Sequence, residues 1–204
     1  PYGLGESGGK SASRGKLAKA DLYAHKSWDS KTLDEHVSLA VSLAENSIVF
    51  GGNYYNLPPS KCWLVWDKKN GTNDFADCEL AWTNLNKAVR RIEWLWHGKI
   101  RKGDDIRQHP TQKPLGVIEW CINHLPDKAK TILDPFMGSG TTLVACAKMG
   151  RKGIGIELDP DYFEIACKRV EDAYRQPDLF VEPPKKAEQG AMDLSLIHLS
   201  EPPQ

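Results

Sequence analysis

Runs of apolar residues alternate along the chain with segments in which apolar residues recur three and four positions apart, and this alternation predicts strands and helices in turn. The helical spacing predicts helices over Leu33–Asn46, Leu115–His124, Leu143–Met149 and Asp161–Tyr174. The apolar runs predict strands over Ile48–Phe50, Cys62–Trp66, Thr131–Asp134 and Gly153–Leu158. The pattern therefore predicts an α/β fold.

The strand patterns also predict how the strands pair. Unbroken apolar runs such as Ile48–Phe50 and Cys62–Trp66 are typical of parallel strands that helices cover on both faces. The segment Arg91–Trp96 alternates apolar and polar residues instead, which is typical of an antiparallel edge strand or a hairpin strand. We therefore expect a mostly parallel sheet flanked by helices.

A turn with two closely spaced glycines follows the strand that ends at Asp134. Gly138 and Gly140 lack a Cβ atom, so the backbone can pass close beneath a ligand at this turn. Thr141 or Thr142 is placed to cap the helix that comes next. The segment is therefore a candidate binding turn for a cofactor.

The acidic residue Glu157 lies at the carboxyl end of the following strand, where a carboxylate can accept hydrogen bonds from a ribose diol. The turn lacks the G-x-G-x-x-G fingerprint of dinucleotide sites and the G-x-x-x-x-G-K-[ST] motif of nucleoside triphosphate sites. An adenosyl group fits this half of a Rossmann fold better than either ligand.

Length and composition limit the classes of protein to which the chain can belong. A chain of 204 residues with a net charge of zero predicts one domain that does not bind polyanions over its whole surface. The segment from Lys87 to Lys113 is nevertheless basic, with eight Lys or Arg against three Asp or Glu. Five scattered cysteines without zinc spacing predict reduced core thiols and no metal site. No apolar run is long enough to predict a membrane span, so we expect an intracellular protein.

Both ends of the chain differ in composition from its centre. Gly3 to Ala20 is rich in Gly, Ser and Lys, which predicts a mobile loop. Residues 177–204 lack periodicity, which predicts a disordered tail, and Leu194–Glu201 is unlike the rest and is interpreted as a cloning or assembly scar.

Four segments, taken in order, resemble the β-group of amino-methylating DNA methyltransferases, the adenine-N6 and cytosine-N4 enzymes that use S-adenosyl-L-methionine. Pro1-Tyr2-Gly3 is similar to the end of the catalytic [D/S]-P-P-Y motif of that family. His109–Pro114 is similar to its H-P-T-Q-K-P segment, Asp134–Gly140 to its D-P-F-x-G-S-G turn, and Gly155-Ile-Glu157 to its ribose-binding strand.

The resemblance implies a Rossmann-like methyltransferase fold with a circularly permuted motif order, because the catalytic motif precedes the cofactor turn. It implies a methyltransferase domain over residues 1–176, in which the connection 97–108 recognises the target. The Asp or Ser and the Pro that should precede Pro1 are missing. We therefore expect an amino-terminally truncated fragment without its first strands, which is marginally stable or aggregation-prone and catalytically silent on duplex DNA when alone.

The resemblance also implies roles for single residues. Acceptors near Pro1 would draw the target amine out of conjugation with its ring, and Tyr2 would stack on the flipped base. Asp134 would orient the turn or meet the cofactor's ammonium group, while Lys113 could equally be a solvated neighbour of the helix start. The implied cofactor-binding residues are Asp134, Phe136, Gly138, Gly140, Glu157, Gln112 and Lys113. Basic residues available to DNA in the connection are Lys99, Arg101, Lys102 and Arg107.

Adenine is the expected target base, because Gly3 after Tyr2 favours the adenine form of the motif. The alternatives are cytosine-N4 methylation and an inactive module that retains only cofactor or DNA binding. We expect duplex DNA as the partner, and either a cognate restriction endonuclease or none, as in orphan and phage-type enzymes. We expect a cytoplasmic protein that is encoded by a bacterium or a phage.

Overall fold

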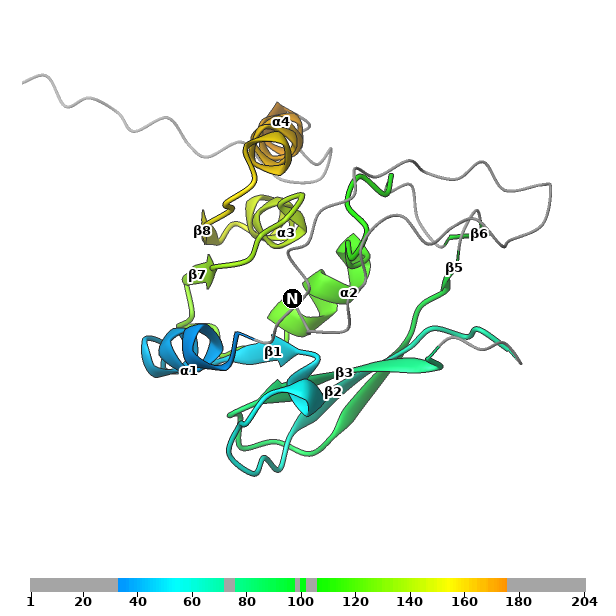
Figure 1. Ribbon diagram of the computed structural model, residues 1–204, viewed down its shortest axis with the longest axis vertical. Coiled ribbons are helices and arrows are strands. Elements are labelled where there is room, and N and C mark those ends of the chain that lie inside the picture. The colour runs from blue at the N-terminus through cyan, green and yellow to red at the C-terminus, as the bar shows by residue number, and fades with distance from the viewer. Residues whose placement is uncertain (1–32, 72–75, 98–99, 102–105, 176–204) are drawn as a thin grey trace, which may run out of the picture.

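A computed structural model describes residues 33–71, 76–97, 100–101 and 106–175. Pro1, Tyr2, the predicted loop Gly3–Ala20 and the predicted tail 177–204 lie outside the described residues. The elements in chain order are α1 (Asp34–Ser42), β1 (Ile48–Phe50), the 3-10 helix η1 (Gly52–Tyr54), β2 (Trp63–Asp67), β3 (Cys78–Thr83), β4 (Arg90–Glu93), β5 (Trp96–His97), β6 (Ile100–Arg101), α2 (Leu115–Ile122), β7 (Thr131–Asp134), α3 (Thr141–Lys148), β8 (Lys152–Gly155) and α4 (Pro160–Arg175). Helices and sheets pack together as in an α/β fold (Figure 1).

The largest sheet contains four strands in the order β1-β3-β2-β4. Strand β3 pairs antiparallel with both β1 and β2, whereas β2 and β4 pair in parallel. The expectation that Ile48–Phe50 and Cys62–Trp66 are strands of a parallel sheet is therefore wrong for β1, and it holds for β2 only in its pair with β4. The predicted pattern did not include β3, and this unpredicted strand lies between the two apolar ones.

The segment predicted as one strand over Arg91–Trp96 is divided in the structure. Its first part, β4, is an edge strand as expected, but it pairs in parallel with β2 because the chain returns to the sheet in the same direction. Its last residue, Trp96, belongs to β5, which forms a short antiparallel hairpin with β6. The edge position is confirmed, and the antiparallel pairing holds only for the hairpin.

Helix α2 packs between the four-stranded sheet and α3 (Figure 1). On one side, its residues Val117 and Cys121 join the sheet core around Leu64. On the other side, Ile122 packs with Ala145 of α3. Burial of apolar side chains on both sides explains why this short helix is so hydrophobic.

The cysteines in the core behave as apolar side chains. All five cysteines are free thiols, and Cys62, Cys121 and Cys146 are buried. Burial raises the pKa of Cys121 to about 12, so this thiol stays protonated at neutral pH. The expectation of reduced core thiols is confirmed for these three residues.

Strands β7 and β8 pair in parallel and are joined by α3, which covers one face. The register pairs Asp134 with Gly155, so the turn after β7 and the segment after β8 emerge at the same end. The predicted β-α-β unit is therefore confirmed. Within the described part of the chain, no helix has the length and apolar character that a membrane span requires.

Candidate cofactor site

The glycines of the turn after β7 adopt backbone angles that favour glycine. Gly138 has φ of 51° and Gly140 has φ of 75°, both in the left-handed region. A Cβ atom on Gly140 would lie 2.9 Å from the Cβ atom of Ala166 in α4, so a larger residue would also meet a neighbouring helix. The turn therefore requires glycine at 140 for its angle and for its packing.

Helix α3 begins at Thr141, and its N-cap residue is Gly140, without a side-chain cap. The prediction that Thr141 or Thr142 caps this helix is therefore wrong. Asp159 does cap α4, because its carboxylate accepts the amides of Asp161 at 3.0 Å and Tyr162 at 3.4 Å.

Glu157 lies beside the turn and holds its backbone. One carboxylate oxygen accepts the Gly138 amide at 2.9 Å, and the other accepts the Asp159 amide at 2.9 Å. A carboxylate has about four lone-pair sites, so each oxygen retains capacity for a further donor. The carboxylate is thus positioned by the backbone and can still accept hydroxyl groups from a ligand.

Asp134 ends β7 and shapes the start of the turn. Its carboxylate accepts the Phe136 amide at 3.1 Å. Burial raises the pKa of Asp134, although hydrogen bonds from the Thr142 side chain and the Phe136 amide oppose that rise. These contacts support the predicted role of Asp134 in orienting the turn.

A cavity of about 630 Å³ adjoins the turn. This volume lies within the range of roughly 300–1,000 Å³ that small-molecule sites occupy. The predicted cofactor-binding residues that line it are Asp134, Phe136, Gly138, Gln112 and Lys113. The other two, Gly140 and Glu157, lie outside the lining, but Glu157 contacts the lining residue Gly138.

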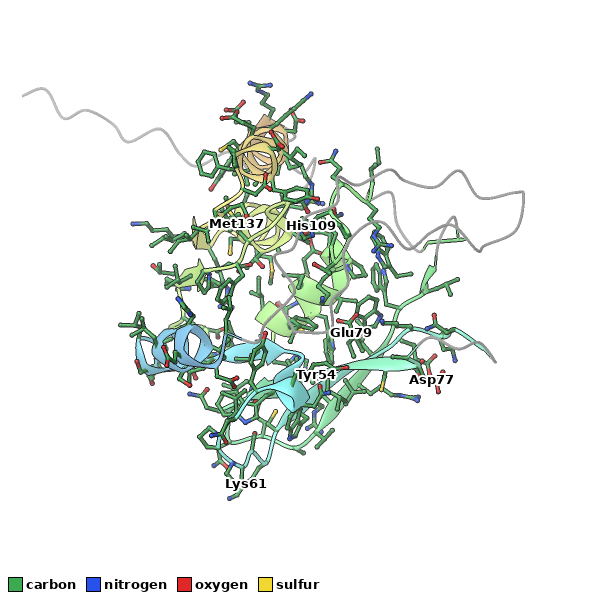
Figure 2. All side chains as sticks on the ribbon, in the orientation of Figure 1. Tyr54, Lys61, Asp77, Glu79, His109 and Met137 are labelled. Carbon is green, nitrogen blue, oxygen red and sulfur yellow. The ribbon has the colours of Figure 1, made fainter. Side chains whose placement is uncertain are left out.

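His109 packs under the turn and was not predicted as a site residue. Its ring lies 3.5 Å from the position of a Cβ atom on Gly138, and it makes an edge contact with Tyr162 at 4.2 Å between ring centres. Burial, together with the charges of Lys113 and Arg107, lowers the pKa of His109 to about 4. The ring is therefore neutral at pH 7, and Figure 2 shows it near α3.

Lys113 faces the cavity and also reaches the four-stranded sheet. Its ammonium group lies 3.1 Å from the carboxylate of Glu79 in β3, which also pairs with Lys68 at 2.9 Å. Although burial alone would raise the pKa of Glu79, the charges of Lys113 and Lys68 hold it below its usual range. The ion pair shows that Lys113 is more than a solvated neighbour of the helix start.

Gln112 and Arg169 connect the turn to its surroundings through Ser139. The Ser139 hydroxyl donates to the Gln112 side-chain oxygen at 2.9 Å. Arg169 of α4 donates to the Ser139 carbonyl at 2.5 Å and to the Thr141 hydroxyl at 3.1 Å. Sequence reasoning missed Arg169 and Ser139. A charged residue on the apolar face of α4 is the signal that could have identified Arg169.

The predicted DNA-contacting residues are only partly described. Lys99 and Lys102 lie outside the described residues, as do the predicted catalytic residues Pro1 and Tyr2. Arg101 lies in β6, and nothing of its side chain is described. Arg107 lies beside the turn region, where its Nε donates to the His109 carbonyl at 3.3 Å. No group of His, Cys, Asp or Glu within the described ranges could hold a metal ion.

The family of the chain follows from comparisons with known proteins. The family model described as DNA methylase matches residues 44–168, which is more than half of the chain. The chain is 37% identical over 120 residues to the Type II methyltransferase M2.DpnII of Streptococcus pneumoniae, covering 58% of this chain and 37% of that protein. It is 40% identical over 111 residues to M2.LlaDCHI of Lactococcus lactis subsp. cremoris, covering 52% of this chain and 40% of that protein.

The crystal structure of the M1.HpyAVI-SAM complex aligns with a TM-score of 0.39 and 34% identity, over 54% of this chain and 61% of that chain. The chain spans about two fifths of the length of the two curated relatives above. The match of the family model to residues 44–168 shows that this chain belongs to the family of DNA methylases.

Proposed function

We propose that the chain forms part of a DNA methyltransferase that binds S-adenosyl-L-methionine at the turn after β7 and methylates an exocyclic amine of duplex DNA. The observation that carries this proposal is the hydrogen bond of the Gly138 amide to Glu157 at 2.9 Å. This bond supports a single site, because the expected ribose acceptor contacts a residue that lines the cavity.

The residues at the cavity fit the chemical groups of S-adenosyl-L-methionine. Phe136 is 41% exposed and offers an aromatic face to an apolar part of the ligand. Asp134 offers a carboxylate to the cofactor's ammonium group, and Lys113 offers an ammonium group to its carboxylate. When bound, the cofactor supplies an electrophilic methyl group.

The remaining chemistry is assigned to the catalytic motif, of which this chain contains Pro1 and Tyr2. The lone pair of an exocyclic amine is delocalised into its ring. The Asp or Ser expected before Pro1 and a backbone carbonyl near Pro1 accept hydrogen bonds from the amine, which draws the lone pair out of conjugation and makes the nitrogen a better nucleophile. Tyr2 stacks on the base after it leaves the duplex, which offsets part of the cost of flipping. This assignment rests on the motif Pro1-Tyr2-Gly3.

We propose adenine-N6 as the methylated position, with cytosine-N4 as the second candidate. Gly3 after Tyr2 supports adenine. The connection 97–108 is proposed to contact the DNA, within a methyltransferase domain over residues 1–176. The similarity to Type II methyltransferases supports a restriction-modification setting.

The methylated base is tested with the chain joined to an amino-terminal segment that ends in Asp-Pro, which supplies the first half of the catalytic motif. DNA is incubated with this protein and methyl-labelled cofactor, and the nucleosides are separated by mass spectrometry. We expect labelled N6-methyladenine. Labelled N4-methylcytosine would reject adenine, and unlabelled DNA from a protein that binds the cofactor would reject the proposed activity.

A further inference from the structure

The side chain of Gln112 forms hydrogen bonds at both ends of its amide. Its oxygen accepts the Gln108 amide at 2.8 Å and the Ser139 hydroxyl at 2.9 Å. Its nitrogen donates to the Ile106 carbonyl at 3.0 Å. The side chain is buried, with 6% of the residue exposed, so water does not readily replace these partners.

The partners of Gln112 belong to two segments that are far apart in the sequence. Ile106 and Gln108 lie on either side of Arg107, one of the basic residues proposed to contact DNA and the one whose side chain the structure describes. Ser139 lies between the two glycines of the cofactor turn. One amide side chain therefore joins the end of the connection to the turn.

The Ser139 end of this link is held firmly. Its hydroxyl accepts a hydrogen bond from Arg169 at 3.0 Å while it donates to Gln112, and its carbonyl accepts from the same guanidinium group at 2.5 Å. Ser139 is also buried, at 3% exposed. Gln112 therefore forms a buried, continuous hydrogen-bonded connection between residues 106–108 and the turn.

We propose that Gln112 is a positioning residue that couples DNA contact at Arg107 to cofactor binding at the turn. The inference rests on the proposed function, because it requires both ligands. DNA held by Arg107 fixes Ile106 and Gln108, and Gln112 then fixes Ser139 in the cofactor turn. Binding of either ligand thus removes part of the ordering cost of the other, so the coupling is positive and reciprocal.

Only an amide can make these contacts together. The link requires one acceptor that serves two donors and one donor for a carbonyl, and a glutamine side chain supplies both. Gln112→Met keeps a similar length but has no strong donor or acceptor. Gln112→Glu keeps the acceptors for Gln108 and Ser139 but loses the donor to Ile106.

The test is calorimetric titration of S-adenosyl-L-methionine into the full chain, alone and with a saturating mixed-sequence DNA duplex. For the unsubstituted chain we expect DNA to tighten cofactor binding about fivefold or more, the range typical of coupled sites. For Gln112→Met we expect this ratio to fall to nearly one, and for Gln112→Glu we expect an intermediate ratio.

Asn84→Leu is the matched control. The Asn84 side chain accepts the Ser47 amide at 2.8 Å and donates to the Glu45 carbonyl at 3.0 Å, so it bridges two backbone groups that line the cavity but take no part in the Gln112 link. This variant is expected to lose thermal stability without any change in the coupling ratio. An equal fall in the ratio for Asn84→Leu and Gln112→Met would overturn the proposal.

Ser139→Ala cuts the link at the turn while Gln112 keeps its bonds to the connection. The ratio should fall as far as in Gln112→Met, and the double variant should show no further fall, because both substitutions break one link. Binding of both ligands with full coupling in either variant would overturn the inference and leave the proposed function standing. Failure of the unsubstituted chain to bind the cofactor would overturn both.

Discussion

The cofactor turn and the four-stranded sheet are stabilised in different ways. The turn is shaped by two left-handed glycines and by hydrogen bonds that it donates to the side chains of Glu157 and Gln112. The sheet is stabilised by buried apolar side chains around Leu64 and Trp66, which pack against α2. Burial supplies stability without fixing a ligand geometry, whereas the polar contacts fix a geometry. Substitutions in the sheet should therefore change stability most, and those in the turn should change binding most.

The largest expected loss of stability comes from the sheet core. Leu64→Ala removes a side chain that is 1% exposed, which should lower the free energy of unfolding by about 4 kcal/mol. Urea denaturation measures the change, and Leu39→Ala, at a residue 59% exposed, is the control with little expected effect. Cofactor affinity of the folded Leu64→Ala protein should stay unchanged. A loss of affinity without unfolding would show that the two regions are not separable.

The next effect concerns the angle and packing of the turn. Gly140→Ala should lower the free energy of unfolding by about 3 kcal/mol, because it adds left-handed strain and a clash with Ala166. Gly150→Ala is the matched control, since Gly150 has φ of 63° with nothing within 4 Å of its Cβ position, and should cost about 1 kcal/mol. Thermal and urea unfolding compare the two variants. Equal losses would mean that contact with α4 does not restrict the turn.

His109 should make the turn region sensitive to pH. Its folded pKa of about 4 lies below the unfolded value of 6.5, so the unfolded chain takes up a proton first as the pH falls. The contribution of the neutral His109 ring to the free energy of unfolding is fully present above pH 6.5 and is lost as the pH falls toward 4. We expect the free energy of unfolding to decrease by about 2 kcal/mol between pH 6.5 and about pH 5.

The control for this pH dependence is His109→Asn, whose side-chain oxygen can accept the Thr111 amide in place of the ring nitrogen. Unfolding free energies of both proteins are measured across the window. We expect the difference between them to change with pH as stated above. Parallel curves for the two proteins would contradict the buried neutral state of His109.

The smallest effect concerns the ion pairs of Glu79 in β3, one within the sheet region with Lys68 and one with Lys113 at the cavity. Lys68→Met leaves Glu79 with Lys113 as its remaining ion-pair partner among the described pairs, and should lower the free energy of unfolding by about 1 kcal/mol. Lys69→Met removes a more exposed pair with Glu93 and should have almost no effect. Urea denaturation at neutral pH distinguishes the two, and equal effects would argue against a special role for the Glu79 pairs.

The sequence predicted the turn region well because its signals are local. Gly138, Gly140 and Glu157 fall within one β-α-β unit, and the parallel register of β7 and β8 follows from that connection. Helix α2 was predicted from its first residue, Leu115, since Pro114 marks the boundary.

Other features depend on contacts between distant segments. Strand β3 has the mixed sequence Cys78–Thr83, and its pairing with β1 and β2 decides their antiparallel direction. The contacts of Gln112 and Arg169 with Ser139 join three separate segments, so spacing along the chain gives no signal for them. The cap of α3 was mispredicted because the left-handed angle of Gly140 sets the helix start.

The most direct test of the proposed cofactor site is calorimetric titration of S-adenosyl-L-methionine into the chain and its Glu157 variants. Glu164→Ala, which removes an exposed carboxylate from α4, is the control for charge. We expect the unsubstituted chain and Glu164→Ala to bind the cofactor equally, and Glu157→Ala to lose most of the affinity. Glu157→Gln, which can still accept the Gly138 amide, should also bind weakly if the carboxylate holds the ribose. Unchanged affinity in both Glu157 variants would contradict the assigned site.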